Sequence, residues 1–171
     1  MALYYWASPS MPGLVTRLGV AQGRCAMRSN LRPAQSSDFD YCASLYFAGM
    51  ETTIRELNLN MDAQVAGFRQ RWDVTQVRII TIDGVDIGWV QSFVNDGTLF
   101  LAQLFVDAPF QRKGIGTEVV NALIEDADRA GQAVTLGVVK TNPALRLYER
   151  LGFRITHNDS RKFHMRRECG E

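Results

Sequence analysis

The middle of the chain alternates short apolar segments with turn sequences. The apolar, β-branched segments run from Gln76 to Ile82, from Asp86 to Val94 and from Thr98 to Val106. Asp83-Gly84 and Asn95-Asp96-Gly97 separate them, and such sequences favour tight hairpin turns between strands. The third segment is apolar on both faces, so the pattern predicts a central strand that is covered on both sides.

Helices are predicted on both sides of these strands. Between Gly114 and Ala130 the apolar positions recur every four residues, with acidic side chains opposite them, which favours an amphipathic helix. Ser37-Asp38 can cap an earlier helix, and a second one is expected from about Asp62 to Trp72. Asn142-Pro143 carries the N-cap and first-turn proline signals of a last helix, which Gly152 ends.

Four shorter strands complete the pattern. They are expected at Ser29 to Arg32, Val134 to Val139, Phe153 to Thr156 and Lys162 to Arg166. The order of elements is then β-α-α-β-β-β-α-β-α-β-β, which predicts a protein of the α/β (α+β) class. No internal repeat or low-complexity run interrupts this order.

The composition is typical of an ordinary globular protein. The 171 residues suffice for one domain, and 46% are apolar and 22% charged. A net charge of +1 argues against nucleic acid or an anionic membrane as partner, and no stretch approaches the roughly 20 apolar residues of a membrane-spanning helix. We therefore expect a soluble, cytoplasmic protein.

Cysteine and histidine offer no metal site. Cys25, Cys42 and Cys169 are widely spread, whereas zinc ligands usually come in close pairs, so we expect reduced, incidental thiols and no metal. His157 and His164 are expected on the surface of edge strands.

The N-terminal region differs from the rest of the chain. The first 37 residues contain four Arg but no Asp or Glu, and residues 1–26 show no sustained period. A signal peptide would place positive charge before an apolar run, but the first basic residue here is Arg17. We interpret residues 1–26 as an N-terminal extension of uncertain status and residues 27–168 as the domain.

One segment between a strand and a helix suits a phosphate. It joins two cations to two glycines and comprises Gln111, Arg112, Lys113, Gly114, Ile115, Gly116 and Thr117. The first N–H groups of a helix lack internal partners, and glycine lets the backbone approach an anion closely. A tight turn that merely needs glycine explains the segment equally well, and it matches neither the nucleotide-triphosphate loop nor the dinucleotide fingerprint.

Three segments together resemble the GNAT superfamily of N-acetyltransferases. They are Leu104-Phe105-Val106, the loop Gln111–Gly116, and the block from Asn142 to Phe153, which contains the sequences Asn-Pro-Ala, Leu-Tyr and Gly-Phe. The loop resembles the Gln/Arg-x-x-Gly-x-Gly/Ala motif that binds acyl-CoA in that family. The resemblance implies a mixed, mostly antiparallel sheet of about seven strands, splayed between its fourth and fifth strands, with four helices and acetyl-CoA in the cleft.

The resemblance also assigns roles to single residues. Leu104, Phe105 and Val106 would offer backbone groups to the pantetheine arm, and residues 111–117 would hold the pyrophosphate. The later block would contribute to the cofactor site through Asn142, Ala144, Leu147 and Tyr148. Tyr148 would protonate the departing thiolate, because a phenol with a pKa of about 10 is protonated at neutral pH.

The general base and the acceptor are less defined. Some family members carry a carboxylate where this chain has Gln103, so we regard Glu51 as the candidate base, with Glu56 as the alternative. The acceptor pocket is expected from residues 41–73 and the last two strands, with its aromatic candidates at Tyr46, Phe47, Trp72, Trp89, Phe93 and Phe163. A small amine, an amino acid and a peptide N-terminus all remain open as acceptors, as does a homodimer.

Two other functions compete with acetyl transfer. A sensor that binds acyl-CoA without catalysis would explain the missing carboxylate at position 103. An unrelated phosphate-binding α/β domain would explain the loop, but not the block around Tyr148.

Overall fold

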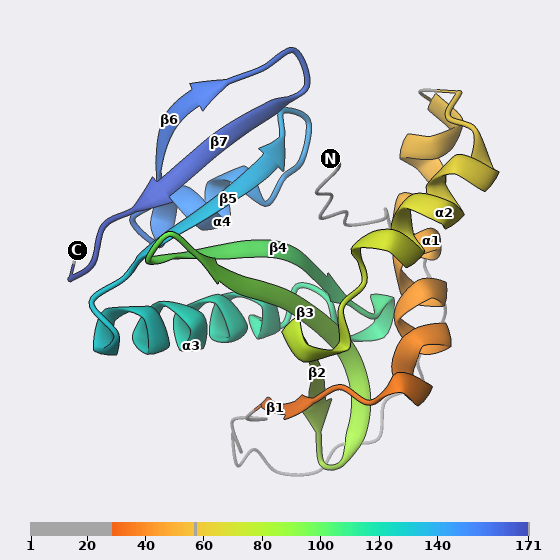
Figure 1. Ribbon diagram of the computed structural model, residues 1–171, viewed down its shortest axis with the longest axis horizontal. Coiled ribbons are helices and arrows are strands. Elements are labelled where there is room, and N and C mark those ends of the chain that lie inside the picture. Colours follow the sequence, from red (N-terminus) through yellow and green to blue (C-terminus); the bar gives the residue numbers. More distant parts are fainter. Residues whose placement is uncertain (1–28, 57, 171) are drawn as a thin grey trace, which may run out of the picture.

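A single sheet of seven strands organises the structure, a computed structural model that describes residues 29–56 and 58–170. The strand order is β1-β2-β3-β4-β5-β7-β6 (Figure 1), and only the β4–β5 pair is parallel. The strands are β1 (Asn30–Pro33), β2 (Val77–Ile82), β3 (Val85–Asn95), β4 (Thr98–Val106), β5 (Ala133–Val139), β6 (Arg154–Asn158) and β7 (Lys162–Arg167). The predicted strands and the mixed, mostly antiparallel sheet are confirmed.

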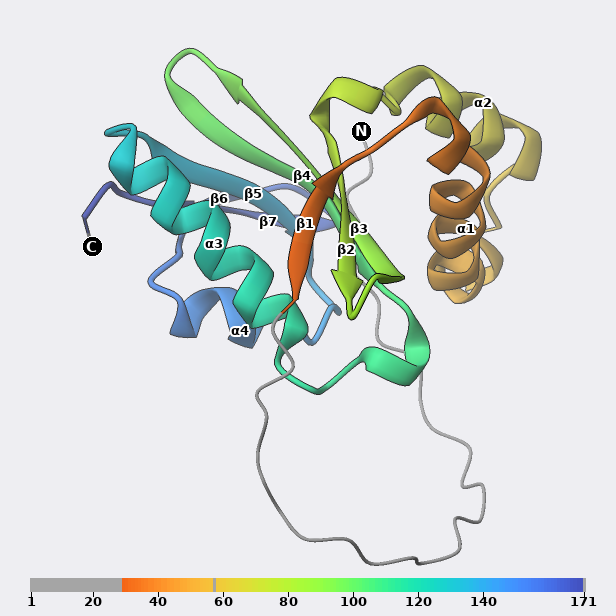
Figure 2. The ribbon, with the colours of Figure 1, turned by 90° about the horizontal axis from the view of Figure 1, so that it is seen from below.

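Four α-helices cover the two faces of the sheet. They are α1 (Phe39–Glu56), α2 (Met61–Arg71), α3 (Ile115–Arg129) and α4 (Leu145–Arg150). Figure 2 shows α1 and α2 on one face and α3 and α4 on the other. Each pair of helices encloses its own apolar cluster against the sheet.

The sheet opens between its two central strands. β4 and β5 pair only from Thr98 to Leu101 and from Ala133 to Leu136. Beyond these residues the two strands diverge (Figure 1), so the end of β4 and the end of β5 form the two sides of a wedge. The splay expected between the fourth and fifth strands is confirmed.

The hairpins between β2, β3 and β4 follow the turn signals in the sequence. Asp83 and Gly84 have φ values of 51° and 78°, and Asp96 and Gly97 have 47° and 71°. Two successive positive φ values match the right-handed twist of the flanking strands. The first turn aligns β2 with β3, and the second aligns β3 with β4.

Two helix starts differ from the sequence prediction. The last helix begins at Leu145 rather than at Asn142-Pro143, because Oδ1 of Asn142 accepts a hydrogen bond from the N–H of Ala144 and forms a separate turn. The first helix is preceded by a short 3-10 turn at Ser36–Asp38, and the Asp38 carboxylate turns back to Arg32 and to the N–H of Gln35. Asp38 is thus the third residue of a capping box rather than the N-cap.

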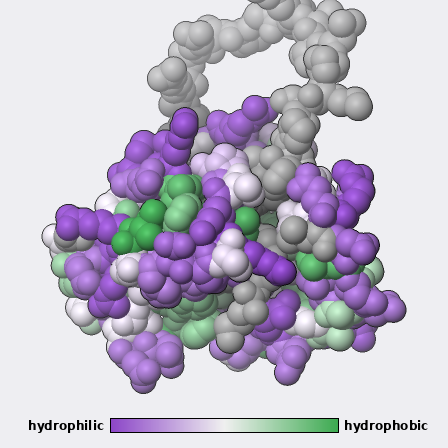
Figure 3. All heavy atoms as spheres, turned by 90° about the horizontal axis from the view of Figure 1, so that it is seen from above, coloured by the Kyte–Doolittle hydropathy of each residue, from purple (hydrophilic) through white to green (hydrophobic). Residues whose placement is uncertain are grey.

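The surface seen in Figure 3 is mainly hydrophilic, with hydrophobic residues in small groups. Among the described residues, five large apolar side chains are exposed: Met61 and Val65 on α2, Val85 and Val94 on β3, and Ile155 on β6. Scattered exposed apolar residues are normal on a surface in contact with water. In the described part of the chain no helix is long and apolar enough to cross a membrane.

Candidate active site

The glycine-containing loop leads directly into the N-terminus of α3. Gly114 precedes the helix in a left-handed conformation, with φ of 88°, which glycine adopts without strain. The first N–H within the helix to find a helical acceptor is that of Glu118, which donates to the carbonyl of Gly114. The N–H groups of residues 115–117 therefore form the free, positive end of the helix.

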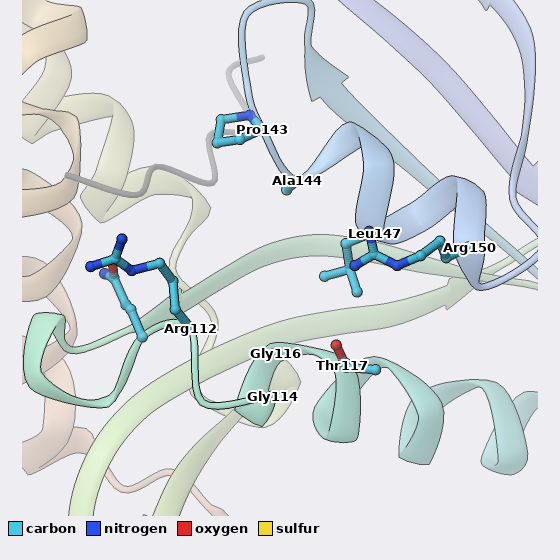
Figure 4. A pocket seen from close by; sticks show the side chains of 9 residues that line it. Arg112, Gly114, Gly116, Thr117, Pro143, Ala144, Leu147 and Arg150 are labelled. Carbon is cyan, nitrogen blue, oxygen red and sulfur yellow. The ribbon is translucent and has the colours of Figure 1, made fainter. Parts of the chain in front are cut away.

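A pocket of about 240 Å³ lies between this helix end and α4. Figure 4 shows the α3 residues on one side of it and the α4 residues on the other. The lining residues are Gln111, Arg112, Gly114, Gly116, Thr117, Pro143, Ala144, Leu147 and Arg150. Arg112 and Arg150 add charge to the helix end, so the pocket suits a di-anionic group such as a pyrophosphate.

Asn142 contributes an unused donor beside this pocket. Its side chain is 5% exposed, and Oδ1 accepts the N–H of Ala144 at 2.8 Å. Among the described residues Nδ2 has no hydrogen-bond partner. A buried donor left unpaired costs about 1–3 kcal/mol, so the position favours a ligand that accepts a hydrogen bond there.

The wedge side of β4 offers backbone groups. The N–H of Asp107 donates to the carbonyl of Ile87, and hydrogen-bonded pairs in an antiparallel ladder recur at every second residue. Phe105 therefore turns its backbone groups toward β3, while Leu104 and Val106 turn theirs toward the wedge. The carbonyl of Val106 is taken by Nε2 of Gln111 at 2.7 Å, which leaves its N–H facing the opening.

A second pocket of about 90 Å³ lies at the end of β4, against α1. It is lined by Leu45, Ala48, Gly49, Phe105, Val106, Asp107, Ala108 and Gln111. Gln111 thus contributes to both pockets, and α1 packs closely here because an ideal Cβ on Gly49 would lie 3.1 Å from the Phe105 ring. The second pocket adjoins the N–H of Val106 at the opening of the wedge.

The structure brings most of the expected coenzyme residues together, but four of them differ from expectation. The first is Phe105, whose backbone groups face β3 rather than the wedge. Lys113 is exposed, with its Nζ 5.4 Å from the centre of the Phe110 ring. The Ile115 side chain belongs to the core, so only its backbone can serve a ligand. Tyr148 is 4% exposed and packs edge-on against Phe153, one residue after the pocket-lining Leu147.

The carboxylates considered as general base do not lie at these pockets. Glu51 and Glu56 are both exposed on α1, and neither lines the two pockets described above. Gln103 is 6% exposed on β4, and its Oε1 has no hydrogen-bond partner among the described residues. The buried side-chain hydrogen-bond acceptor at this position of β4 is thus an amide oxygen rather than a carboxylate.

The aromatic residues expected at the acceptor pocket separate into groups. Tyr46 and Trp89 are fully buried in the core under α1 and α2, with Phe47 and Trp72 packed against that core. Phe163 packs against the other core, on the α3 side, so its assignment to the acceptor pocket is wrong. It pairs with Val138, which faces α3, whereas its neighbour Lys162 pairs with Val139, which faces α1 and α2.

Lys162 was not singled out by the sequence. It is 7% exposed, and its pKa is lowered to about 8, mainly by burial; Asp159 opposes this shift, while Arg71 and Arg161 contribute to it. A lysine at the start of a short strand is typical of an exposed edge, so only the packed structure reveals this position. His157 lies exposed on the edge strand β6 as expected, whereas His164 lies on β7, which is inside the sheet; the two rings stack 4.2 Å apart.

Among the described residues, the cysteines and the possible metal ligands form no second functional site. Burial raises the pKa of the Cys42 thiol to about 12, which makes it unreactive, and Cys169 is exposed. Within the described residues no group of three or more His, Cys, Asp or Glu is arranged to hold a metal ion.

The sheet is splayed between β4 and β5, and a pocket lies at the turn from β4 into α3. In the comparisons with known proteins, residues 47–153 match the Acetyltransferase (GNAT) family, and the chain belongs to this family. An uncharacterized N-acetyltransferase of Methanocaldococcus jannaschii is 34% identical over 70 residues, which are 40% of this chain and 31% of that protein. The match thus spans about a third of the relative's length.

Solved structures share the fold at low sequence identity. The PaiA N-acetyltransferase of Thermoplasma acidophilum, in complex with coenzyme A, has a TM-score of 0.69 at 14% identity, over 83% of this chain and 99% of that one. Ard1 of Thermoplasma volcanium has a TM-score of 0.62 at 20% identity, over 84% and 99%. The ribosomal-protein-S18-alanine N-acetyltransferase of Escherichia coli has a TM-score of 0.58 at 18% identity, over 84% and 96%.

Proposed function

We propose that this protein transfers the acetyl group of acetyl-CoA to a primary amine by direct attack. The observation that carries the proposal is the pocket between the N-terminus of α3 and α4, with the unpaired Nδ2 of Asn142 beside it and the open side of β4 next to it. Together, these three features can bind the pyrophosphate of acetyl-CoA, an amide of its pantetheine arm and its thioester.

The coenzyme residues follow from this placement. The N–H groups of residues 115–117 and the side chains of Arg112 and Arg150 bind the pyrophosphate, with Gln111 and Gly116 shaping the loop. Nδ2 of Asn142 donates to a carbonyl of the pantetheine arm, and Leu104 offers its backbone groups to the same arm. Ala144 and Leu147 supply the apolar wall.

The reaction then needs an oxyanion donor and an acid. The amine nitrogen attacks the thioester carbonyl, a C–N bond forms, and the N–H of Val106 stabilises the oxyanion. The C–S bond breaks, Tyr148 protonates the thiolate, and the amine gives up its surplus proton to solvent. Tyr148 is the candidate for this step because it directly follows the pocket-lining Leu147 on α4 and because a phenol is protonated at neutral pH. The acceptor is a small-molecule amine or a peptide N-terminus.

Release of free thiol from acetyl-CoA tests the proposal, measured across amines, amino acids and short peptides. In wild type we expect turnover with one class of amine. Tyr148→Phe should lower kcat by about tenfold or more, as loss of a general acid does, with the Kd of acetyl-CoA unchanged. Unchanged kcat in this variant would remove the acid role from Tyr148.

A second candidate is a sensor that binds acyl-CoA without turning it over. It is favoured by Gln103 at the buried position on β4 and by the exposure of both Glu51 and Glu56. Tight binding of acetyl-CoA with no thiol release for any amine would select the sensor.

A further inference from the structure

One ionisable side chain, that of Asp107, belongs to a residue lining the second pocket. The other lining residues are apolar, apart from Gln111, whose Nε2 already bonds the carbonyl of Val106. The pocket between α3 and α4 is lined instead by two cations, Arg112 and Arg150. An acid at the second pocket does not serve an anionic coenzyme, and it favours a ligand that carries positive charge.

Asp107 follows β4 on the face of the sheet that lies under α1. Side chains alternate along a strand, and Phe105 belongs to the core under α1 and α2, whereas Val106 belongs to the other core. With φ of −61° and ψ of 142°, Asp107 continues the extended backbone and shares the face of Phe105. Gln103, whose Oε1 is unpaired among the described residues, lies on the same face. We call this face of residues 103, 105 and 107, together with the second pocket, the acceptor face.

One oxygen of the Asp107 carboxylate is available to a ligand. Oδ1 accepts the N–H of Ala108 at 2.8 Å and caps the short 3-10 turn Ala108–Phe110. Among the described residues Oδ2 has no hydrogen-bond partner, and no ion pair between them includes Asp107. Asn and Ser cap a turn as well as Asp does, so capping alone does not call for a charge at this position.

Asp107 directly follows the residue proposed as oxyanion donor. Val106 and Asp107 both line the second pocket, and Cα atoms of consecutive residues are about 3.8 Å apart. The volume of about 90 Å³ is several times the space that one water molecule needs, so the pocket can hold a small group such as an aminomethyl group. Leu45, Ala48 and Gly49 of α1 form an apolar wall for the carbon atoms next to the nitrogen.

We propose that Asp107 binds the nitrogen of the acceptor and accepts its proton, and that the acceptor is a primary amine with no carboxylate next to this nitrogen. The amine arrives as an ammonium ion, which the carboxylate attracts, and loses one proton to solvent before the attack. As the C–N bond forms, an N–H bond breaks and its proton passes to Oδ2 of Asp107 and then to solvent. The C–S bond breaks and Tyr148 protonates the thiolate, so this inference rests on the proposed acetyl transfer. A carboxylate next to the nitrogen would be repelled by Asp107.

Asp107→Asn removes the charge but keeps the cap, because the amide oxygen of Asn can still accept the N–H of Ala108. We expect kcat/KM for the preferred amine to fall by about tenfold or more, with the Kd of acetyl-CoA unchanged. Asp73→Asn is the matched control, since Asp73 caps another 3-10 turn through the N–H of Thr75 and lines neither pocket. We expect Asp73→Asn to turn over amines as wild type does.

Matched pairs of substrates test the preference. Each amine is compared with the amino acid that differs from it by an added α-carboxylate, such as phenethylamine with phenylalanine and isoamylamine with leucine. In wild type we expect kcat/KM for the amine to exceed that for the amino acid by about tenfold or more, and Asp107→Asn should lose most of this preference. A carboxylate that only caps the turn would leave the preference unchanged.

Calorimetry of both amines with the CoA-loaded protein separates this inference from the proposed function. Equal kcat/KM in wild type and Asp107→Asn, or an equal preference in the two proteins, overturns the role of Asp107 while acetyl transfer stands. Binding of an amine that requires Asp107, without thiol release, supports the amine site and overturns acetyl transfer. Neither binding nor turnover of any amine that lacks a carboxylate overturns the inference.

Discussion

At the scale of single residues, two buried polar atoms without partners among the described residues lie at the proposed ligand sites. Asn142 and Gln103 are both at least nine-tenths buried, and each leaves one side-chain atom unpaired among the described residues. The unpaired atom is a donor, Nδ2, on the coenzyme side and an acceptor, Oε1, on the acceptor side. The two atoms therefore match a ligand carbonyl and a ligand N–H.

The donor of Asn142 can be removed without disturbing its turn. Asn142→Asp keeps the oxygen that accepts the N–H of Ala144 but replaces the donor with a second acceptor. We expect the Kd of acetyl-CoA to rise by about tenfold or more, because the carbonyl of the ligand would then face an oxygen. Titration calorimetry measures the change, with Asn158→Asp at an exposed position as control. An unchanged Kd would show that Nδ2 does not contact the coenzyme.

Arg32 on β1 has a structural role, because it joins this strand to the 3-10 turn before α1 and to β3. It lies 2.8 Å from Asp38 and 2.7 Å from Asp86, and hydrogen bonding to Arg32 lowers the pKa of Asp38. Arg32→Met should reduce the free energy of unfolding by about 1–2 kcal/mol at pH 7, since both carboxylates lose a charged partner.

The difference in the free energy of unfolding between wild type and Arg32→Met should become smaller in acid. A lowered pKa of Asp38 contributes stability above the ordinary pKa of an aspartate, and the contribution disappears as pH falls through the folded-state pKa. Urea unfolding at several pH values should therefore show wild type and Arg32→Met converging in acid. Arg129→Met, at an exposed pair with Asp126, should cost less than about 0.5 kcal/mol. A constant difference at all pH values would contradict this account.

At the scale of elements, the contact between β3 and β4 depends on Gly88. An ideal Cβ at this position would lie 2.3 Å from the carbonyl oxygen of Phe105, which is backbone and cannot rotate away. Gly88→Ala should reduce the free energy of unfolding by about 1–3 kcal/mol and displace β4 beside the wedge. Gly67→Ala is the control, because the added methyl meets only the flexible end of Arg71 and favours the helix. Equal stability of the two variants would contradict the prediction.

Local periodicity predicts most elements, because each strand or helix depends on neighbours in sequence. The turns at Asp83-Gly84 and Asp96-Gly97 and the amphipathic stripe of α3 are examples, and both are confirmed. Prediction fails where side-chain bonds or distant pairings decide. Oδ1 of Asn142 delays the start of α4, and the register of β7 on β5 places Phe163 on the α3 side.

Local sequence patterns also predict part of the site, whereas contacts between residues far apart in the sequence are not predicted. The sequence located the loop at residues 111–117 because glycines and cations adjoin a strand and a helix. It could not find the buried Lys162, since the burial of this side chain depends on the pairing of β7 with β5. The proposed extension at residues 1–26 lies outside the described residues, and the base role of Glu51 stays a prediction at an exposed position.

At the scale of the whole molecule, the wedge divides the sheet between β4 and β5 into two halves that stay joined at one end. One core lies against α1 and α2, and the other lies against α3 and α4. The two halves remain joined by β4 and β5, which pair over four residues each. A ligand that fills the wedge contacts both halves, so bound coenzyme should stabilise the molecule as a unit.

The most direct test of the central claim is calorimetric titration of acetyl-CoA into wild type, Gly114→Glu and Gly114→Ala. The two variants share the strain of a side chain at φ of 88°, but only glutamate adds a charge at the proposed pyrophosphate site. We predict one coenzyme per chain in wild type, weaker binding in Gly114→Ala and no detectable binding in Gly114→Glu. Binding to Gly114→Glu with the wild-type Kd would contradict the claim that the coenzyme lies at the start of α3.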